Sequence, residues 1–325
     1  MSWLGILACS RADTRSNQDR ISRATTTVGA DAARIPLPAP PDTDDFGAPL
    51  PRDAALSARV VSLNPAATEV IFAMGAEAHL VGRSAWDEFP AAAKTVPSLG
   101  DGIRPNVEAV LRARPTLVIL YATAENRAAA DAFQRAGVRT ITLRVDHIAQ
   151  FVTLTQRLGV ALGAGARAQV VADTVQRTLD AVRAATRAVT RTVTAPSVAW
   201  PLWQQPVMVV GRGSYLDELL EIAGARNVFH DLDAPSPTVS VEEIARRNPD
   251  ALVVSARSAT ELRNKPQWRA VAAVRNAHFL IDNPQLTGRP SVVLGMAAVS
   301  LARALHPELA DKLPALPAVV SGVPH

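Results

Sequence analysis

The chain contains six histidines, the residue type that most often binds metal ions or transfers protons near neutral pH. No two of them stand at a spacing that would bring both to one metal ion from a single helix or turn. The sequence also lacks Gly-x-Ser-x-Gly and HExxH signatures, and its single cysteine offers no catalytic nucleophile. We therefore expect no metal site and no hydrolytic centre. The histidines are His79, His147, His230, His278, His306 and His325.

A second candidate for chemistry is Gly211-Arg212-Gly213, which lies between an expected strand and an expected helix. Such a turn could belong to a nucleotide-binding loop. The third glycine of that motif is missing, because Leu216 stands in its place, and no acidic residue follows at the distance that a ribose contact requires. These observations argue against a Rossmann-type enzyme, and we expect a protein that is not an enzyme.

Composition narrows the range of partners. The chain has 325 residues, of which 48% are hydrophobic, enough for one large or two modest domains. The net charge of +4 comes from 34 basic and 30 acidic residues without a basic block, and 4% of the residues are aromatic. Nucleic-acid binding usually needs a concentrated basic face, so no nucleic acid is expected. After the N-terminus no apolar run approaches the length of a membrane span.

The N-terminus carries a separate signal. The run Leu4-Gly5-Ile6-Leu7-Ala8 leads into Cys9 and resembles the lipobox of bacterial lipoproteins, which implies cleavage before Cys9 and lipid on that residue. No Lys or Arg precedes this short run, so residues 1–9 fit a truncated lipoprotein signal with its true start upstream. The alternative is an incidental cysteine. Residues 10–42, polar at first and then rich in proline, are expected to form a disordered linker.

The first half of the remaining chain alternates short apolar strands with helices. Pro65 and Gly75 delimit the first helix, and Asn106 is expected to cap another helix that ends before Pro115. This alternation predicts a parallel sheet covered by helices on both faces. The expected strands are residues 59–64, 79–83, 117–121 and 140–143, and the expected helices are residues 65–74, 106–114 and 125–136.

The second half repeats the scheme. Residues 107–115 align without gaps with residues 241–249, and an apolar strand follows each segment. Ser240 is expected to cap the second of these helices, with Glu243 in capping-box position. An internal repeat predicts two similar lobes with a ligand cleft between them, outside the carboxyl ends of the strands. The other expected strands are residues 207–211, 251–255 and 279–282, and the other expected helices are residues 214–223, 268–274 and 290–305.

A long helical segment, residues 148–189, lies between the two halves. Its first part is amphipathic and is interrupted at Gly163 and Gly165, and a longer helix follows from about Ala166. At about 1.5 Å per residue this second helix is on the order of 35 Å long. It would suit a crossover within one α/β domain, but the repeat on both sides favours a strut between two lobes. The expected divisions are an N-terminal lobe at 43–163, the interlobe helix at 164–190, a C-terminal lobe at 191–306 and a tail at 307–325.

Five segments carry a combined pattern: residues 59–69 (RVVSLNPAATE), Val81-Gly82, residues 106–115 (NVEAVLRARP), residues 215–229 and residues 239–250. Together they resemble the substrate-binding proteins of ABC importers for iron-siderophores, haem and cobalamin, and most of all the cobalamin-binding type. The resemblance covers about residues 44–307. It implies a class III periplasmic binding protein, in which two Rossmann-like α/β lobes with parallel sheets are joined by a single long α-helix, the helical backbone.

The resemblance also implies a role. The protein would be a monomer in the periplasm, or otherwise outside the cytoplasm, where it would capture cobalamin or a related corrinoid in the interlobe cleft. It would deliver this ligand to a permease dimer with its ATPase. The metal-containing macrocycle would be cargo, so no cofactor is expected, and lipid on Cys9 would anchor the protein to the membrane.

In this family one exposed acidic residue on each lobe docks onto arginines of the permease, and Glu108 and Glu242 occupy the matching positions. The internal repeat makes the two residues equivalent without reference to the family, and one carboxylate per lobe suits two basic pockets. The alternative is local, because the helix dipole favours an acid in the first turn of a helix.

The resemblance further implies a ligand site lined by aromatic side chains, whose flat faces suit a large macrocycle. Two aromatic residues match positions of the first lobe, and two tryptophans that end a strand of the second lobe would point one or both indoles into the cleft. The alternative for each is packing within a lobe. Two polar residues match positions near the cleft. The six candidates are Trp86, Tyr121, Trp200, Trp203, Asp282 and Arg289.

The sequence departs from the cobalamin-binding type at two places. Pro235-Ser236-Pro237 stands where a tryptophan is often found, and an aromatic expected near Gly102 is missing. Other ligands of the same family therefore stay open. Haem would need an axial ligand, for which Tyr121 or His230 could serve. An anionic siderophore would need a basic cleft, for which the candidates are Arg83, Arg212 and Arg289.

Overall fold

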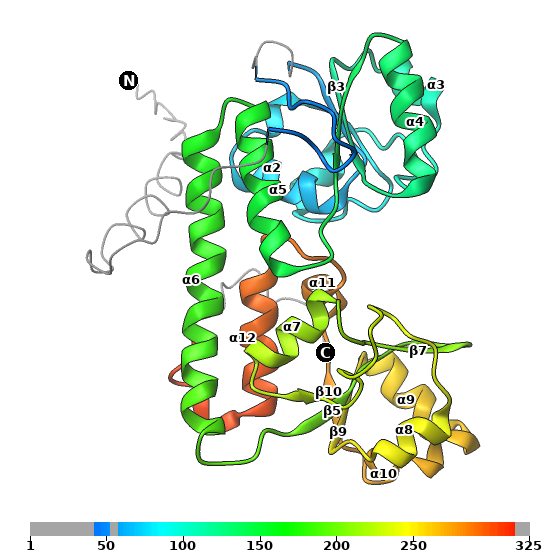
Figure 1. Ribbon diagram of the computed structural model, residues 1–325, viewed down its shortest axis with the longest axis vertical. Coiled ribbons are helices and arrows are strands. Elements are labelled where there is room, and N and C mark those ends of the chain that lie inside the picture. The colour runs from blue at the N-terminus through cyan, green and yellow to red at the C-terminus, as the bar shows by residue number, and fades with distance from the viewer. Residues whose placement is uncertain (1–41, 53–57, 316–325) are drawn as a thin grey trace, which may run out of the picture. The chain divides into compact units, whose positions relative to one another are not determined.

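The computed structural model describes residues 42–52 and 58–315, all of which belong to one compact unit that begins at Pro40. Two four-stranded parallel sheets are connected by a long helix (Figure 1). Within the described ranges no helix combines the length and the hydropathy that a membrane crossing requires. The predictions for Cys9, for residues 1–9 and for all but the end of the linker 10–42 fall outside the described residues.

The N-terminal lobe is built on a parallel sheet with the strand order β2-β1-β3-β4. Alternate residues of β3 enter different core clusters: Ile119 packs with the side of α2 and α5, and Leu120 with the side of α3 and α4. The predicted sheet with helices on both faces is therefore confirmed. The elements are β1 (Val60–Ser62), α2 (Pro65–Ala73), β2 (Leu80–Arg83), α3 (Val107–Arg112), β3 (Leu117–Tyr121), α4 (Ala124–Arg135) and β4 (Arg139–Leu143), with 3₁₀ turns at Glu77–His79 and Ala91–Thr95.

The C-terminal lobe repeats this arrangement. Its sheet order β10-β9-β5-β8 equals β4-β3-β1-β2 when β5, β8, β9 and β10 are matched in chain order with β1 to β4. Helices α3 and α8, which align in sequence, precede the matching strands β3 and β9, so the predicted repeat is confirmed. The elements are β5 (Ser197–Ala199), α7 (Tyr215–Ile222), β8 (Arg226–Asn227), α8 (Val241–Arg247), β9 (Ala251–Val254), α9 (Ala256–Asn264), a 3₁₀ turn (Pro266–Ala270), α10 (Ala272–Arg275), β10 (Phe279–Ile281), α11 (Pro284–Thr287) and α12 (Leu294–Leu305).

Several elements of this lobe differ from the sequence-based expectation, among them α11, which is not among the expected helices, and α12, which begins at Leu294 and not at residue 290. The strand expected at residues 207–211 is β7 (Val207–Val209), which pairs antiparallel with β6 (Pro201–Gln204) in a separate hairpin and does not join the parallel sheet. The sequence does not predict helix α9, because the segment is mostly polar and only Ala259 and Leu262 in it are buried. Strand β8 is too short to show any periodicity.

The predicted link between the lobes is confirmed as a single long helix. Helix α5 (Ile148–Ala161) ends before Gly163, which adopts a positive φ of 62°, and α6 runs from Gly165 to Thr190. Helix α6 packs against α5 at one end and against α12 of the second lobe at the other (Figure 1). The break therefore folds α5 back onto α6, and α6 alone connects the two lobes.

The hydrophobic core does not stop at the lobe boundary. One cluster of buried residues extends from Val60 and Ile119 in the first sheet through α5 and α6 to Leu219 on α7 and Ala298 on α12. A continuous core of this kind resists a change in the angle between the lobes, because opening would expose apolar surface. Residues 307–315, assigned to the expected tail, join the same cluster through Leu309 and Leu313, with a 3₁₀ turn at Pro307–Leu309.

Candidate functional site

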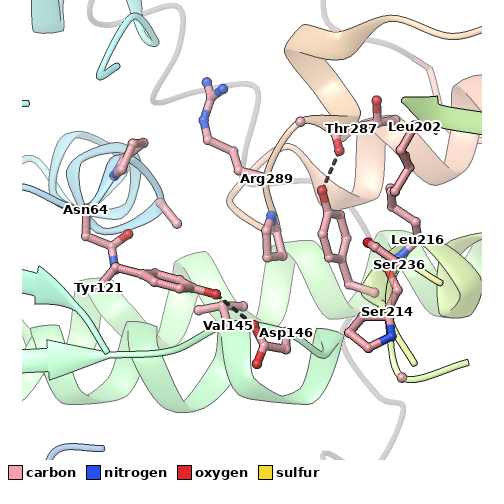
Figure 2. A pocket seen from close by; sticks show the side chains of 17 residues that line it. Asn64, Tyr121, Val145, Asp146, Leu202, Ser214, Leu216, Ser236, Thr287 and Arg289 are labelled. Atoms are coloured by element: carbon pink, nitrogen blue, oxygen red, sulfur yellow. Dashed lines mark hydrogen bonds between the residues drawn. The ribbon is translucent and has the colours of Figure 1, made fainter. Parts of the chain in front are cut away.

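A cleft of about 460 Å³ lies between the two lobes (Figure 2). The first lobe contributes residues at the carboxyl ends of its strands, and the second contributes the start of α7 and the loop before α12, as expected for parallel α/β lobes. The lining residues are Asn64, Pro65, Ala66, Tyr121, Val145, Asp146, Leu202, Gly213, Ser214, Tyr215, Leu216, Pro235, Ser236, Thr287, Gly288, Arg289 and Pro290.

Two tyrosines of the lining are held by hydrogen bonds that their own phenols donate. Tyr121 Oη donates to Asp146 Oδ1 at 2.7 Å, and Tyr215 Oη donates to the Thr287 carbonyl at 2.5 Å; Figure 2 marks both bonds. Burial raises the pKa of each phenol well above its usual range, and the Asp146 carboxylate adds to this effect on Tyr121. Both side chains therefore stay protonated at neutral pH and present rigid aromatic surface to the cleft.

The two charged residues of the lining are both compensated. Asp146 lies 3.6 Å from the Nε of Arg144 in addition to its bond from Tyr121. Arg289 donates from Nε to Glu69 Oε1, and Ser291 Oγ donates to the other oxygen of Glu69 at 2.5 Å. With Glu69 ionised, the described cleft is thus close to electrically neutral.

Glu69 is a buried carboxylate, 1% exposed, that reaches from α2 towards the second lobe. Burial raises its pKa from 4.5 to about 7, against the opposing effects of Arg289 and Ser291. The Nη2 atom of Arg289 is buried and has no hydrogen-bond partner among the described residues. A buried donor without a partner costs about 1–3 kcal/mol, which a ligand acceptor would recover.

Of the six candidate ligand residues, Tyr121 and Arg289 line the cleft. Asp282 does not line the cleft itself, but its carboxylate accepts hydrogen bonds from the hydroxyl of the lining residue Thr287 at 2.7 and 2.9 Å. Burial raises the pKa of Asp282. Trp86 is not among the residues lining the cleft; it is 65% exposed, with its Nε1 3.3 Å from Asp101 Oδ1.

The two tryptophans of the second lobe have different environments. Trp200 is 3% exposed and packs in the core that the lobes share. Trp203, on β6, is 63% exposed and lines a second groove of about 520 Å³. Leu202, which lies between the two tryptophans in the sequence, lines both the groove and the cleft.

Glu108 and Glu242 are both exposed in the first turn of their helices, α3 and α8. Asn106 and Ser240 cap these helices, as the sequence predicts. Glu243 does not form the expected capping box, because its carboxylate accepts hydrogen bonds from Arg246 and Arg247 instead. The two glutamates thus occupy equivalent positions of the repeat, and both carboxylates face solvent.

The other candidate ligand groups lie apart from the cleft or are already engaged. The described residues contain no group of three or more His, Cys, Asp or Glu side chains arranged to hold a metal ion. His230 lines a different cavity and bonds through Nδ1 to Asp217 Oδ2 at 2.7 Å. Arg212 lies 3.5 Å from Asp233, and Arg83 donates to the carbonyls of Val96 and Ser84.

Several lining residues carry no motif that single-residue inspection would detect. Asn64 and Asp146 follow strands β1 and β4, and Ser214 caps α7. Their signal is positional: each stands directly after a strand or directly before a helix, where parallel α/β folds place their ligand contacts. Tyr215 and Thr287 meet through a contact between residues 72 positions apart, which the sequence does not reveal.

Comparisons with known proteins agree with this arrangement. A family model described as periplasmic binding protein matches residues 60–286. The vitamin B12-binding protein of Pectobacterium atrosepticum is 24% identical over 238 residues, 71% of this chain and 85% of the relative.

Solved structures give the same result. A periplasmic heme-binding protein of Pseudomonas aeruginosa is 27% identical with a TM-score of 0.69, over 77% of this chain and 93% of that one. The apo form of a periplasmic heme-binding protein from Roseiflexus sp. RS-1 is 25% identical with a TM-score of 0.69, over 77% of this chain and 98% of that one. Because the family model spans most of the chain, the chain belongs to the periplasmic binding protein family: it is the extracytoplasmic substrate-binding component of an ABC importer, which works with a small-molecule ligand and a permease with its ATPase, and it is not an enzyme.

Proposed function

We propose that this protein captures cobalamin or a related corrinoid in the cleft between its lobes and delivers it to the permease. The observation that carries the proposal is the charge state of the cleft: its two charged lining residues, Asp146 and Arg289, are both compensated by neighbours. The rest of the lining is aromatic, apolar or neutral polar. A corrin ring carries neutral amide groups on a large apolar frame, and such a surface suits a neutral cleft with a few hydrogen-bonding groups.

Arg289 lines this cleft, and its buried Nη2 is a hydrogen-bond donor without a partner among the described residues. Glu69 binds the guanidinium through Nε, so Nη2 is left to donate to a ligand carbonyl that reaches it. An amide carbonyl of the corrin periphery is an acceptor of the right kind. The ligand's cobalt would need no protein atom, and the macrocycle is therefore cargo and not a resident cofactor.

Haem is the second candidate, favoured by the similarity to heme-binding structures at 25% and 27% identity. Haem needs an axial ligand and a place for two carboxylates. Both cleft tyrosines donate their protons to neighbouring oxygens, and their raised pKa values oppose the tyrosinate form that would bind iron. His230 lies in another cavity. An anionic siderophore would need unpaired positive charge in the cleft, whereas Arg212 and Arg289 are paired with carboxylates.

Delivery to the permease would use Glu108 and Glu242. Each is exposed at the start of a helix, on equivalent positions of the two lobes. Carboxylates presented in this way can pair with permease arginines through short charge-assisted hydrogen bonds. Hydrogen bonds from its own backbone N–H and from Ser240 lower the pKa of Glu242, which keeps this carboxylate charged for docking.

Membrane attachment through lipid on Cys9 and a monomeric state belong to the same proposal. The support for the lipid is the apolar run that ends in Ala8-Cys9. Expression in a bacterial host followed by fractionation tests it: the protein should appear in the membrane fraction, and Cys9→Ser should release it. Membrane association that survives this substitution would count against lipidation, and light scattering of the released protein would test the monomer.

Titration with cobalamin, followed by tryptophan fluorescence and by the visible spectrum of the corrinoid, is the direct test of the ligand. We expect saturable binding at micromolar concentrations or below, and Tyr121→Ala should weaken it by about tenfold or more because it removes cleft surface. Val170→Ala, at an exposed position of α6, is the matched control and should not change affinity. Binding of haemin with a shifted Soret band, and no response to cobalamin, would favour haem.

A further inference from the structure

The hairpin β6–β7 has no counterpart in the described part of the first lobe. In the first lobe, residues 63–64 alone separate β1 from α2, whereas residues 200–214 separate the matching elements β5 and α7. The segment 235–239 fixes the hairpin, because Val209 N donates to the Pro237 carbonyl and Val239 N donates to the Val207 carbonyl, both at 3.0 Å. The hairpin is therefore a well-supported addition at the cleft side of the second lobe.

A groove of about 520 Å³ lies between this hairpin and α9. Leu202 lines both the groove and the cleft, so the two cavities adjoin at this side chain. A ligand that is larger than the cleft can extend past Leu202 into the groove. The pairing of β6 with β7 is irregular between Pro201 and Trp203, and such an irregularity turns neighbouring side chains to different sides.

The groove has one more cationic than anionic side chain. Its charged lining residues are Arg257, Glu261 and Lys265, and Arg257 Nε donates to Glu261 Oε1 at 2.8 Å. Lys265 Nζ donates instead to the neutral side chain of Gln204. Two ammonium protons of Lys265 are thus available for an anion.

The same groove offers an aromatic plane. Trp203 is 63% exposed, and its Nε1 donates to the Gln205 carbonyl at 3.0 Å, which restrains the indole. An indole held at the wall of a groove can stack on a planar heteroaromatic base. An aromatic plane and a lysine in one groove match a ligand part that contains both a base and an anion.

We propose that this groove is a second subsite that binds the phosphate-linked heteroaromatic tail of a complete corrinoid. Trp203 stacks on the base, Lys265 pairs with the phosphodiester, and the corrin ring fills the adjoining cleft. This subsite rests on the proposed function, because the ring must occupy the cleft for the tail to reach the groove. It also assigns a role to the exposed Trp203, which does not line the cleft itself.

The test compares cobalamin with cobinamide, which has the same ring but lacks the nucleotide tail, by isothermal titration calorimetry. The wild-type protein should bind cobalamin about tenfold or more tightly than cobinamide, as one charge-assisted contact and one stacked base would give. Lys265→Gln and Trp203→Ala should each remove most of this preference and leave the affinity for cobinamide unchanged. Added salt should narrow the preference in the wild type more than in Lys265→Gln.

Arg263→Gln is the matched control, because this residue is exposed on α9 but does not line the groove. Equal affinity for both corrinoids in the wild type, or variants that weaken both corrinoids alike, would overturn the subsite while the proposed function stands. Failure of either corrinoid to bind would overturn the proposed function and the subsite together. Thermal melts of each variant separate a loss of binding from a loss of folding.

Discussion

Arg289, in the loop before α12, donates a hydrogen bond from Nε to the buried carboxylate of Glu69 on α2, and this ion pair joins the two lobes beside the ligand cleft. Ser291 Oγ, from the same loop, donates to the second oxygen of Glu69 at 2.5 Å. Above a pH of about 7, where Glu69 is ionised, the pair neutralises the one cation that lines the described cleft. It also places a titratable group between the lobes. The pKa of this group differs between the folded and the unfolded state.

The first prediction concerns the pH dependence of stability. The pKa of Glu69 is about 7 in the folded protein and close to 4.5 in the unfolded chain, because burial favours the protonated acid. The folded state therefore holds the proton more tightly, and the contribution of Glu69 to stability, complete below pH 4.5, is lost as the pH rises through about 7. Between these limits the free energy of unfolding should fall by roughly 3 kcal/mol on account of this group.

Chemical denaturation of the wild type and of Glu69→Gln from pH 4.5 to 8 measures this contribution. The wild type should lose stability relative to the variant across the range, whereas Asp282, whose pKa burial also raises, affects both proteins alike. Glu125→Gln is the control: Glu125 is exposed, and the pKa of its carboxyl is lowered, chiefly by its own backbone N–H. A stability difference between wild type and Glu69→Gln that does not change with pH would contradict the prediction.

The sequence predicts the sheets and the linking helix because their signals are local. Strand β3 is a continuous apolar run, and Gly163 stops α5 before α6 begins. The duplicated segments at residues 107–115 and 241–249 extend this local information to the two-lobe architecture, since two copies of one unit must form two lobes.

The cleft itself is less visible in the sequence, because its contacts join distant segments. The ion pair between Glu69 and Arg289 links residues 220 positions apart, and no sequence pattern in either segment indicates this contact. Trp200 and Trp203 look alike in the sequence, yet one is in the core and the other is exposed. The strand β6 begins between them, and a local change in backbone direction decides which indole is buried.

The second prediction concerns the packing of α5 against α6. A Cβ added at Gly159 would lie 2.5 Å from Ala168 Cβ and 3.2 Å from Gly165 Cα, so the two helices would have to separate. Gly159→Ala should therefore lower the free energy of unfolding by about 1–3 kcal/mol. Gly165→Ala is the control, since no atom lies within 4 Å of its added Cβ and its helical backbone suits alanine. That variant should be neutral or up to about 1 kcal/mol more stable in urea denaturation.

The third prediction separates docking from ligand capture. Glu108→Ala combined with Glu242→Ala should abolish transport in a reconstituted importer and leave ligand affinity unchanged, because neither residue lines the cleft. Each single variant should retain part of the activity, since one carboxylate remains. Glu125→Ala tests specificity, because Glu125 is also an exposed acid in the first turn of a helix of the first lobe. If Glu125→Ala impairs transport as much as the double variant, general surface charge and not the paired sites would be responsible.

The fourth prediction concerns the rigidity of the lobes. Glu218 on α7 accepts hydrogen bonds from the Ile148 amide at 2.8 Å and contacts His147 Nδ1 at 2.6 Å, so the second lobe is tied to the start of α5. Together with the shared core, this contact should limit closure on ligand binding to a small motion. Glu218→Ala should lower the free energy of unfolding by about 1–3 kcal/mol and speed hydrogen exchange at the Ile148 amide. Glu221→Ala, an exposed acid one turn further along α7, should do neither. Small-angle scattering should give nearly equal radii of gyration for the free and ligand-bound wild type, and a large decrease on binding would contradict a rigid link.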